Sequence, residues 1–325
     1  MDFYIGIDIG GTKSAVVLAR EENSGFEIIE KVQFATLPCK ECIAKFMAEI
    51  DTILEKYSLS NDAISSIGIS CGGPLDSRKG IIMSPPNLIG WDNVEIVKIF
   101  SEKYSTKVFI QNDANACALA EWKFGAGKGT ENMVFMTFGT GLGAGLIINE
   151  RLYDGTNGNA GEVGHIRLER FGSVGYGKRG SFEGFCSGSG IAQAARVRAM
   201  ELLQMGKKCG YCDGISELEN ISAKSVAIAA DSGDLDALAV YRECGEYLGR
   251  GISILIDILN PERIVIGSIY TRSENLLAKA MNDIIEKEAL PQASSVCKVV
   301  PAVLGESIGD YAAISVAIEG KLGNL

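Results

Sequence analysis

The strongest constraint on the fold is a pattern that the sequence contains twice: an apolar strand, a turn of glycine and threonine, and a second apolar strand. The two copies occupy residues 3–19 and 133–148, with their turns at 10–13 and 139–143. Both copies lead into alternating strands and helices, which indicates an internally duplicated α/β chain. A chain of 325 residues also exceeds the size at which one hydrophobic core stops growing, which favours two domains with a cleft between them.

Hydrophobic periodicity supports this organisation. Apolar residues in the segment 43–57 show the spacing of an amphipathic helix, and a strand is predicted after it at 64–70. The pattern predicts domains at 1–120 and 121–325, and the last helix, about 308–320, can pack back on the first domain. The other predicted helices are 94–104, 113–123, 191–205, 223–231, 235–259 and 274–288, and the other predicted strands are 26–35, 107–111, 263–267 and 296–300.

Charge and hydropathy exclude two classes of partner. A net charge of −10 lacks the basic footprint that nucleic-acid binding requires. No window reaches 18 uninterrupted apolar residues, and no basic region precedes the first apolar stretch. We therefore expect a cytoplasmic protein that binds neither nucleic acid nor membrane.

The cysteines predict reduced thiols. Nine of them are scattered through a chain that is too large to need disulfide bonds for stability. Cys39 and Cys42 have CxxC spacing, as do Cys209 and Cys212, and either pair could be half of a zinc site or a redox pair. Structural zinc usually has four ligands, so an interpretation without metal is favoured for both pairs.

The first turn combines a carboxylate with two glycines, in the order Asp8-Ile-Gly-Gly-Thr-Lys13. Glycines let backbone N–H groups approach a phosphate closely. A carboxylate such as Asp8 beside a polyphosphate requires a cation between them, and Mg²⁺ suits both groups. An ordinary hairpin turn is the alternative, but the second glycine turn favours a nucleotide held by both. Neither turn has P-loop spacing, and the second opens onto a strand, unlike a Rossmann turn.

Several polar residues follow a predicted strand in the segment Gln111-Asn-Asp-Ala-Asn115. Asp113 would lie at a sheet edge and at a helix N-terminus, which favours its ionised form. Phosphoryl transfer needs a residue that positions the attacking hydroxyl and accepts its proton, so Asp113 is the predicted base. The alternative is an Asn or Asp N-cap, although a cap needs one such residue.

The single histidine, His165, lies in a glycine-rich stretch from 155 to 190 that is too long for a simple connection. A lone histidine is often structural. Glu162 precedes it by three residues and Glu183 follows in the same stretch. These carboxylates and the imidazole could converge on neutral hydroxyl groups, which are features of a sugar.

A series of motifs resembles the ROK family of sugar kinases and sugar-responsive repressors. The resemblance extends over essentially the whole chain. It implies an α/β, two-domain actin-like fold (ribonuclease H-like, as in hexokinase, Hsp70 and actin) with an interdomain cleft. For the kinases of the family it also implies transfer of the γ-phosphoryl group of ATP to a hexose hydroxyl. The motifs are DIGGTK at 8–13, GGP at 72–74, PNLIGW at 86–91, NDANA at 112–116, GTGLGAG at 139–145 and NAGEVGH at 159–165.

The resemblance also implies roles for individual residues. Asp113 matches the catalytic base of the family. Positions that contact or approach the sugar are Asn87, Asn112, Asp113, Glu162, His165 and Glu183. Positions that bind the nucleotide are Gly10, Gly11, Thr12, Lys13, Thr140, Gly141 and Gly267. Asp8 joins this second set, with Mg²⁺ held through ATP near its carboxylate.

One motif departs from the family. Relatives commonly follow the histidine with CxCGxxGCxE, whose cysteines bind a structural zinc together with the histidine. Val174, Tyr176 and Ser181 occupy the cysteine positions here. One imidazole does not hold zinc alone, so we expect the protein to fold and work without it. We also expect Val174, Tyr176 and Phe182 to pack inward where the metal lies in relatives. The alternative is replacement ligands from Cys186, Cys209 and Cys212.

The sequence therefore predicts an ATP-dependent hexose kinase, and the resemblance favours a homodimer. Glucose, N-acetylmannosamine and N-acetylglucosamine are the expected acceptors, and the sequence does not choose among them. A repressor is one alternative, but it would carry a winged helix-turn-helix before the first glycine turn, where seven residues precede Asp8. A catalytically silent sugar-binding protein is the other alternative.

Overall fold

The computed structural model describes residues 2–22 and 25–325, and the predicted α/β class is confirmed. The strands are β1 (Phe3–Ile9), β2 (Lys13–Glu22), β3 (Gly25–Ala35), β4 (Ile64–Cys71), β5 (Leu75–Asp76), β6 (Ile81–Ile82), β7 (Val108–Asn112), β8 (Met133–Phe138), β9 (Leu142–Ile148), β10 (Arg151–Leu152), β11 (Val174–Gly175), β12 (Lys178–Arg179), β13 (Arg263–Ile266) and β14 (Lys298–Pro301). The helices are α1 (Cys39–Lys56), α2 (Ile96–Tyr104), α3 (Asp113–Phe124), α4 (Phe182–Phe185), α5 (Gly188–Gln204), α6 (Ala223–Asp231), α7 (Leu235–Leu259), α8 (Ile269–Glu288), α9 (Pro291–Ser294) and α10 (Ile308–Leu322).

These elements form two compact units. Unit 1 contains residues 1–131, 145–160 and 303–325, and unit 2 contains residues 132–144 and 161–302. The division expected at residue 120 is a single cut, whereas the chain passes between the units four times. The C-terminal segment belongs to unit 1 because α10 packs against β1, β4 and α3.

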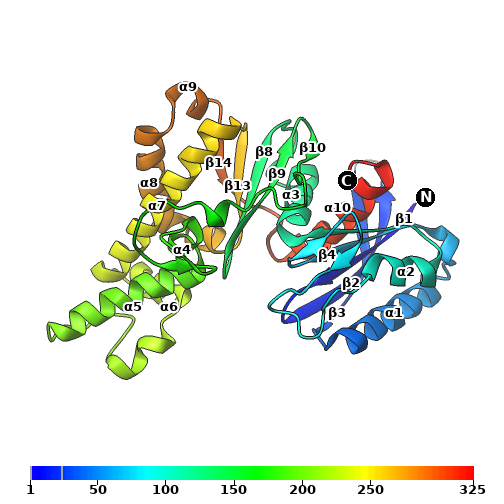
Figure 1. Cartoon of the computed structure of the whole chain (residues 1–325), viewed down its shortest axis with the longest axis horizontal. Helices are drawn as coiled ribbons and strands as arrows, with labels where there is room; N and C mark the ends of the chain where they lie inside the picture. The colour runs from blue at the N-terminus through cyan, green and yellow to red at the C-terminus, as the bar shows by residue number, and fades with distance from the viewer. Residues whose placement is uncertain (1, 23–24) are drawn as a thin grey trace. The chain divides into compact units, whose positions relative to one another are not determined.

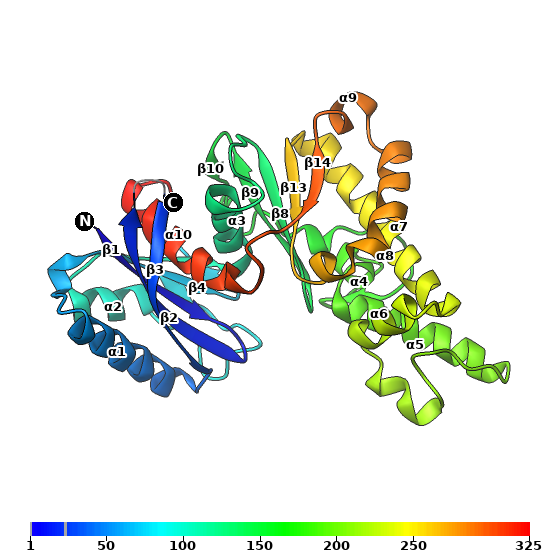
Figure 2. The same cartoon turned by 180° about the vertical axis from the view of Figure 1, so that it is seen from behind.

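A five-stranded sheet forms the centre of unit 1, in the order β3-β2-β1-β4-β7. β1, β2 and β3 pair antiparallel, as expected for the opening hairpin, and β1–β4 and β4–β7 pair parallel. Figures 1 and 2 show α1 and α2 on one face of this sheet and α10 on the other. Ile5 and Ile7 of β1 belong to the core under α1, while Tyr4 packs with Ile314 of α10. Alternate side chains of one strand thus serve two cores, which explains why β1 is apolar throughout.

A second five-stranded sheet has the order β10-β9-β8-β13-β14, and the turn between β8 and β9 is the second glycine turn. β13 pairs parallel with both β8 and β14. In unit 2 the 25-residue helix α7 packs against α5, α6 and α8 (Figure 1). Helix α8 begins at Ile269, five residues before its predicted start. Ser273 interrupts it with φ −130° and ψ 25°, so the predicted start marks the first residue after this kink.

Hydropathy of the helices bears on membrane insertion. Among residues 2–22 and 25–325, none of the helices is both long and apolar enough to span a lipid bilayer.

Candidate functional site

The first glycine turn connects β1 and β2 in unit 1, and its geometry explains why it needs glycine. The Gly10 N–H donates to the Lys13 carbonyl across the turn at 3.1 Å. A Cβ on Gly10 would lie 2.6 Å from that carbonyl oxygen, and one on Gly11 would lie 3.0 Å from the Asn87 Cβ. Gly11, Thr12 and Lys13 are exposed. The turn therefore presents accessible backbone groups, with Asn87 directly against it.

Asp8 lies at the end of β1, before this turn, in an acidic neighbourhood. Burial has the largest effect on the pKa of its carboxyl group. Together with the nearby carboxylates of Asp310 and Asp113, burial raises the pKa of Asp8 to about 6, while Lys31 and the Ser70 hydroxyl oppose the rise. Asp310 is itself buried and pairs with Lys31 at 2.7 Å. The structure thus brings Asp8 and Asp113 together, from β1 and from the start of α3.

Asn112 and Asp113 stand at the junction of β7 and α3. Asn112 is the N-cap of α3, because its Oδ1 accepts from the Asn115 N–H at 2.8 Å. Asp113 is the first helical residue, and its Oδ1 accepts from the Ala114 N–H at 2.8 Å. The capping alternative therefore holds for Asn112 and leaves Asp113 free of that role.

The ionisation of Asp113 depends on two opposing effects. Its side chain stays accessible to solvent, yet the surrounding protein displaces enough water that desolvation raises its pKa. The backbone N–H groups of Ala114 and of Asp113 itself lower the pKa, but they do not outweigh desolvation. The helix N-terminus thus favours the ionised form, as expected, but its effect on the pKa is smaller than that of desolvation. A carboxylate with a raised pKa is a stronger proton acceptor than an ordinary aspartate.

In unit 2, the second glycine turn is hydrogen-bonded to Glu183, a residue that is predicted to contact the sugar. Glu183 Oε2 accepts from the Leu142 N–H at 3.0 Å, and a Cβ on Gly141 would lie 2.7 Å from the same oxygen. Thr140 is exposed at the tip of the turn. Gly267, buried after β13, donates its N–H to the Met136 carbonyl of β8 at 3.0 Å. Glu183 and Gly141 are therefore direct neighbours, and Gly267 follows the strand beside β8.

Two residues at the N-terminus of α5 lie beside this turn and were not among the predicted site residues. The Gly188 N–H donates to the Gly139 carbonyl at 2.8 Å, and the Ser189 hydroxyl donates to the Thr140 carbonyl at 2.6 Å. The run Ser187-Gly-Ser-Gly190 before a predicted helix is an N-cap signal that could have indicated them. They connect a helix N-terminus, which favours anions, to the turn that is predicted to bind phosphate.

Glu162 precedes a short 3₁₀ helix, Val163–His165, and His165 is its last residue; both side chains are exposed. Gly164 between them packs closely, since a Cβ there would lie 2.1 Å from the Leu142 carbonyl oxygen and 3.2 Å from the Glu183 Cβ. The structure thus brings the segment carrying Glu162 and His165 against Glu183 and the second glycine turn.

The three positions where the family commonly has zinc-binding cysteines are Val174, Tyr176 and Ser181 here, and their side chains have other roles. Ser181 is buried and caps α4, accepting from the Gly184 N–H at 3.1 Å. Val174 and Tyr176 are 42% and 77% exposed, so the prediction that they pack inward was wrong. Phe182 is fully buried, as predicted. Because thiolates are missing and two positions face solvent, the residues present do not fit a structural zinc.

The cysteines do not replace these ligands. The thiols of Cys186, Cys209 and Cys212 are buried, and burial raises the pKa of Cys186 and of Cys209. Within residues 2–22 and 25–325, no group of three or more His, Cys, Asp or Glu side chains could hold a metal ion. Mg²⁺ normally binds through one or two carboxylates plus phosphate oxygens and water, so Asp8 remains compatible with a nucleotide-bound Mg²⁺.

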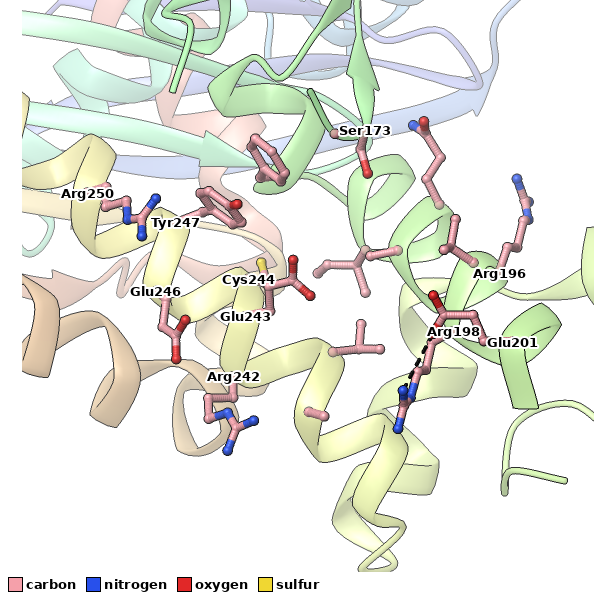
Figure 3. A pocket seen from close by; sticks show the side chains of 18 residues that line it. Ser173, Arg196, Arg198, Glu201, Arg242, Glu243, Cys244, Glu246, Tyr247 and Arg250 are labelled. Atoms are coloured by element: carbon pink, nitrogen blue, oxygen red, sulfur yellow. Dashed lines mark hydrogen bonds and ion pairs between the residues drawn. The ribbon is translucent and has the colours of Figure 1, made fainter. Parts of the chain in front are cut away.

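A cavity of about 1060 Å³ lies elsewhere in unit 2, between α5 and α7. Figure 3 shows charged side chains of both signs around it, including Arg198 and Glu201 from α5 and Arg242 and Glu246 from α7. Its lining includes none of the predicted site residues. The candidate site residues are therefore those of the first glycine turn with Asp8 and Asp113 in unit 1, and those of the second glycine turn with Glu183 in unit 2.

Comparison with known proteins identifies relatives over nearly the full length of the chain. The model of the ROK family matches residues 4–319. A glucokinase of Halalkalibacterium halodurans is 33% identical over 94% of this chain and 92% of the relative. Among solved structures, a ROK family glucokinase from Streptomyces griseus in complex with glucose and AMPPNP has a TM-score of 0.75 and 28% identity, covering 98% of this chain and 100% of that one. A ROK family transcriptional regulator has a TM-score of 0.81 and 27% identity, covering 98% of this chain and 79% of that one.

Proposed function

Because the chain belongs to the ROK family, we propose that it is an ATP-dependent sugar kinase in which Asp113 is the general base. One observation carries this proposal: Asp113 combines an accessible carboxylate, a raised pKa and a position beside the Asp8 carboxylate. A base that stays poised to accept a proton suits transfer to a neutral hydroxyl. The similarity to a glucokinase over nearly the full length supports the same activity.

The proposed reaction divides its tasks among the residues described above. Asp113 accepts the proton of a hexose hydroxyl while that oxygen bonds to the γ-phosphorus of ATP, and the bond to the β-γ bridging oxygen breaks to release ADP. Backbone N–H groups of the two glycine turns bind the phosphates. When Mg²⁺ is bound near Asp8, it neutralises phosphate charge.

The acceptor sugar is proposed as glucose or an N-acetylhexosamine, namely N-acetylmannosamine or N-acetylglucosamine. Exposed Glu162, His165 and Asn87, with Glu183, offer hydrogen-bonding groups that match hydroxyls. A net charge of −10 and the glucokinase relatives agree with a cytoplasmic enzyme, which we propose acts as a homodimer without a nucleic-acid partner.

A catalytically silent, sugar-responsive protein is the second candidate. The similarity to a ROK family transcriptional regulator favours it, because two proteins of one family can share a fold and differ in activity. Consumption of ATP separates the two candidates.

The test is a coupled ATP-consumption assay with glucose, N-acetylglucosamine and N-acetylmannosamine, run on the wild type and on Asp113→Asn. The wild type should phosphorylate at least one sugar, and Asp113→Asn should lower kcat by about 10²–10⁴-fold. Sugar affinity, measured by calorimetry, should stay nearly unchanged because the amide keeps the shape of the carboxylate. Asp62→Asn, at an exposed acid of unit 1, is the matched control.

Two results would contradict the proposal. Turnover of Asp113→Asn within tenfold of the wild type at saturating sugar would remove Asp113 from the role of base. Sugar binding by the wild type without ATP consumption for any of these sugars would favour the silent alternative.

A further inference from the structure

The hairpin of β11 and β12, which includes Val174 and Tyr176, contains an unusual backbone conformation. β11 and β12 pair antiparallel around the two-residue loop Tyr176–Gly177, and both loop residues have positive φ, +42° and +74°. Two-residue loops of this kind favour Asn or Gly at the first position, because a positive φ strains most side chains and is tolerated best by these two residues. A tyrosine at this point therefore needs an explanation other than turn propensity.

Burial does not provide the explanation, because Tyr176 is 77% exposed. Its ring instead contacts the ring of His165, a residue that is predicted to bind the sugar. The Tyr176 and His165 rings lie 5.9 Å apart between centroids with 71° between their planes, which is the edge-to-face arrangement that aromatic pairs prefer.

Hydrogen bonds hold the backbone of the hairpin, and therefore the point from which the Tyr176 side chain extends. The Gln193 side chain accepts from the Val174 N–H at 3.0 Å and donates to the Val174 carbonyl at 2.9 Å. The Lys178 ammonium donates to the His165 carbonyl at 2.5 Å. One clamp therefore joins the hairpin to α5, and the other joins it to the segment that carries His165.

We propose that Tyr176 is a positioning residue that orients the His165 imidazole for the sugar. The residues around His165 do not fit a metal, and the edge-to-face contact with Tyr176 restricts the imidazole ring. The inference rests on the proposed role of His165 in sugar binding, and it explains why a strained, exposed tyrosine occupies this turn.

The first test does not depend on enzyme activity. His165 is the one histidine of the chain, so NMR spectra of the imidazole contain a single set of histidine signals. Tyr176→Phe should keep the ring-current shift of these signals, and Tyr176→Asn should lose it. Because Asn tolerates positive φ, Tyr176→Asn should fold with a melting temperature no lower than that of the wild type. Phe171→Asn removes another exposed aromatic residue of the same stretch and should leave the signals in place.

The second test measures the sugar. With ATP and glucose, N-acetylglucosamine or N-acetylmannosamine, Tyr176→Asn should raise KM for the accepted sugar about three- to tenfold, the range expected for loss of one aromatic pair, and change kcat less than twofold. Tyr176→Phe should restore the wild-type KM. If the wild type phosphorylates none of these sugars, the proposed function fails, and calorimetric affinities replace KM.

Three outcomes overturn the inference. Histidine signals of Tyr176→Asn that match the wild type would exclude the ring contact whatever the activity. Unchanged sugar affinity in Tyr176→Asn would exclude a positioning role. About one zinc per chain in protein purified without chelator, lost together with activity on chelation, would assign the orientation of His165 to a metal.

Discussion

Asp8 and Asp113 are acids whose ionisation the folded protein opposes. Residue type alone predicts ordinary carboxylates, but desolvation raises the pKa of both groups, and the Asp113 carboxylate adds to the rise at Asp8. Such a cluster is unfavourable for stability in the free protein. In the proposed mechanism the same cluster serves function, because a raised pKa makes the Asp113 carboxylate a better acceptor for the proton of the sugar hydroxyl.

Stability should therefore fall as pH rises through the titration of Asp8. An unfolded aspartate titrates near pH 3.9, whereas Asp8 in the folded protein titrates near 6. Between these values the unfolded state binds fewer protons than the folded state, so the free energy of unfolding decreases with rising pH and then levels off. The full difference corresponds to at most about 3 kcal/mol. Asp8→Asn should remove this contribution, and urea unfolding at pH 5 and at pH 7.5 measures it.

The expected pattern is a stability gain of Asp8→Asn over the wild type that is larger at pH 7.5 than at pH 5. Asp62→Asn, an exposed acid in the same unit, should show no such gain. Parallel pH profiles for the wild type and Asp8→Asn would mean that folding leaves the Asp8 carboxyl as acidic as in the unfolded chain.

Packing between β4 and α10 depends on one glycine in the strand. A Cβ on Gly68 would lie 2.1 Å from the Ala313 carbonyl oxygen and 2.3 Å from the Ala317 nitrogen. These contacts are with backbone atoms, which cannot rotate away as a side chain can. Ser66 adds a hydrogen bond from its hydroxyl to the Ala317 carbonyl at 2.8 Å. The close approach of the helix to the sheet therefore requires glycine at position 68.

Gly68→Ala should accordingly destabilise the protein strongly. Overpacking of this kind typically costs about 1–3 kcal/mol, and rigid backbone on the far side favours the upper end. Gly214→Ala is the matched control, because nothing lies within 4 Å of its added Cβ and its φ is −172°. Thermal unfolding of both variants decides the point, and equal melting temperatures would contradict a close helix–sheet contact at Gly68.

The chain passes between the two units four times. The buried carboxylate of Glu121 binds two segments that lie close in sequence to these passages, the one after α3 and the one before α10. Glu121 of α3 is fully buried. Its Oε1 accepts from the Val303 and Leu304 N–H groups at 3.0 and 2.9 Å, and its Oε2 accepts from the Ala126 N–H at 2.7 Å. The returning C-terminal segment and the segment after α3 are thus held by a single side chain of unit 1.

Glu121→Gln should loosen both segments. An amide replaces one accepting oxygen with an N–H donor, so at least one buried backbone N–H loses its acceptor, at a cost of about 1–3 kcal/mol. Native-state hydrogen exchange should quicken at Ala126 or at Val303 and Leu304. Glu55→Gln, exposed on α1, is the control. Exchange rates unchanged from the wild type at all three amides would exclude this role.

Local patterns were sufficient to predict most helices and strands and to select the candidate site residues. The glycine turns, the amphipathic helix α1 and the segment around Asp113 are recognisable because turn propensity, periodicity and capping act over a few neighbouring residues. The boundaries that differed have a local cause, as at the kink in α8. The class of fold and the family therefore follow from the amino-acid sequence by itself.

Contacts between distant segments decided the rest. The pKa of Asp8 depends on burial and on Asp310, some 300 residues away in the sequence, and desolvation outweighs the helix N-terminus at Asp113. Likewise, Val174 and Tyr176 look like core residues by type, but hairpin geometry and the Gln193 clamp turn them outward. Local propensity acts over a few residues, whereas desolvation, charge coupling and the exposure of a side chain depend on which distant segments surround it, and only the tertiary structure specifies those neighbours.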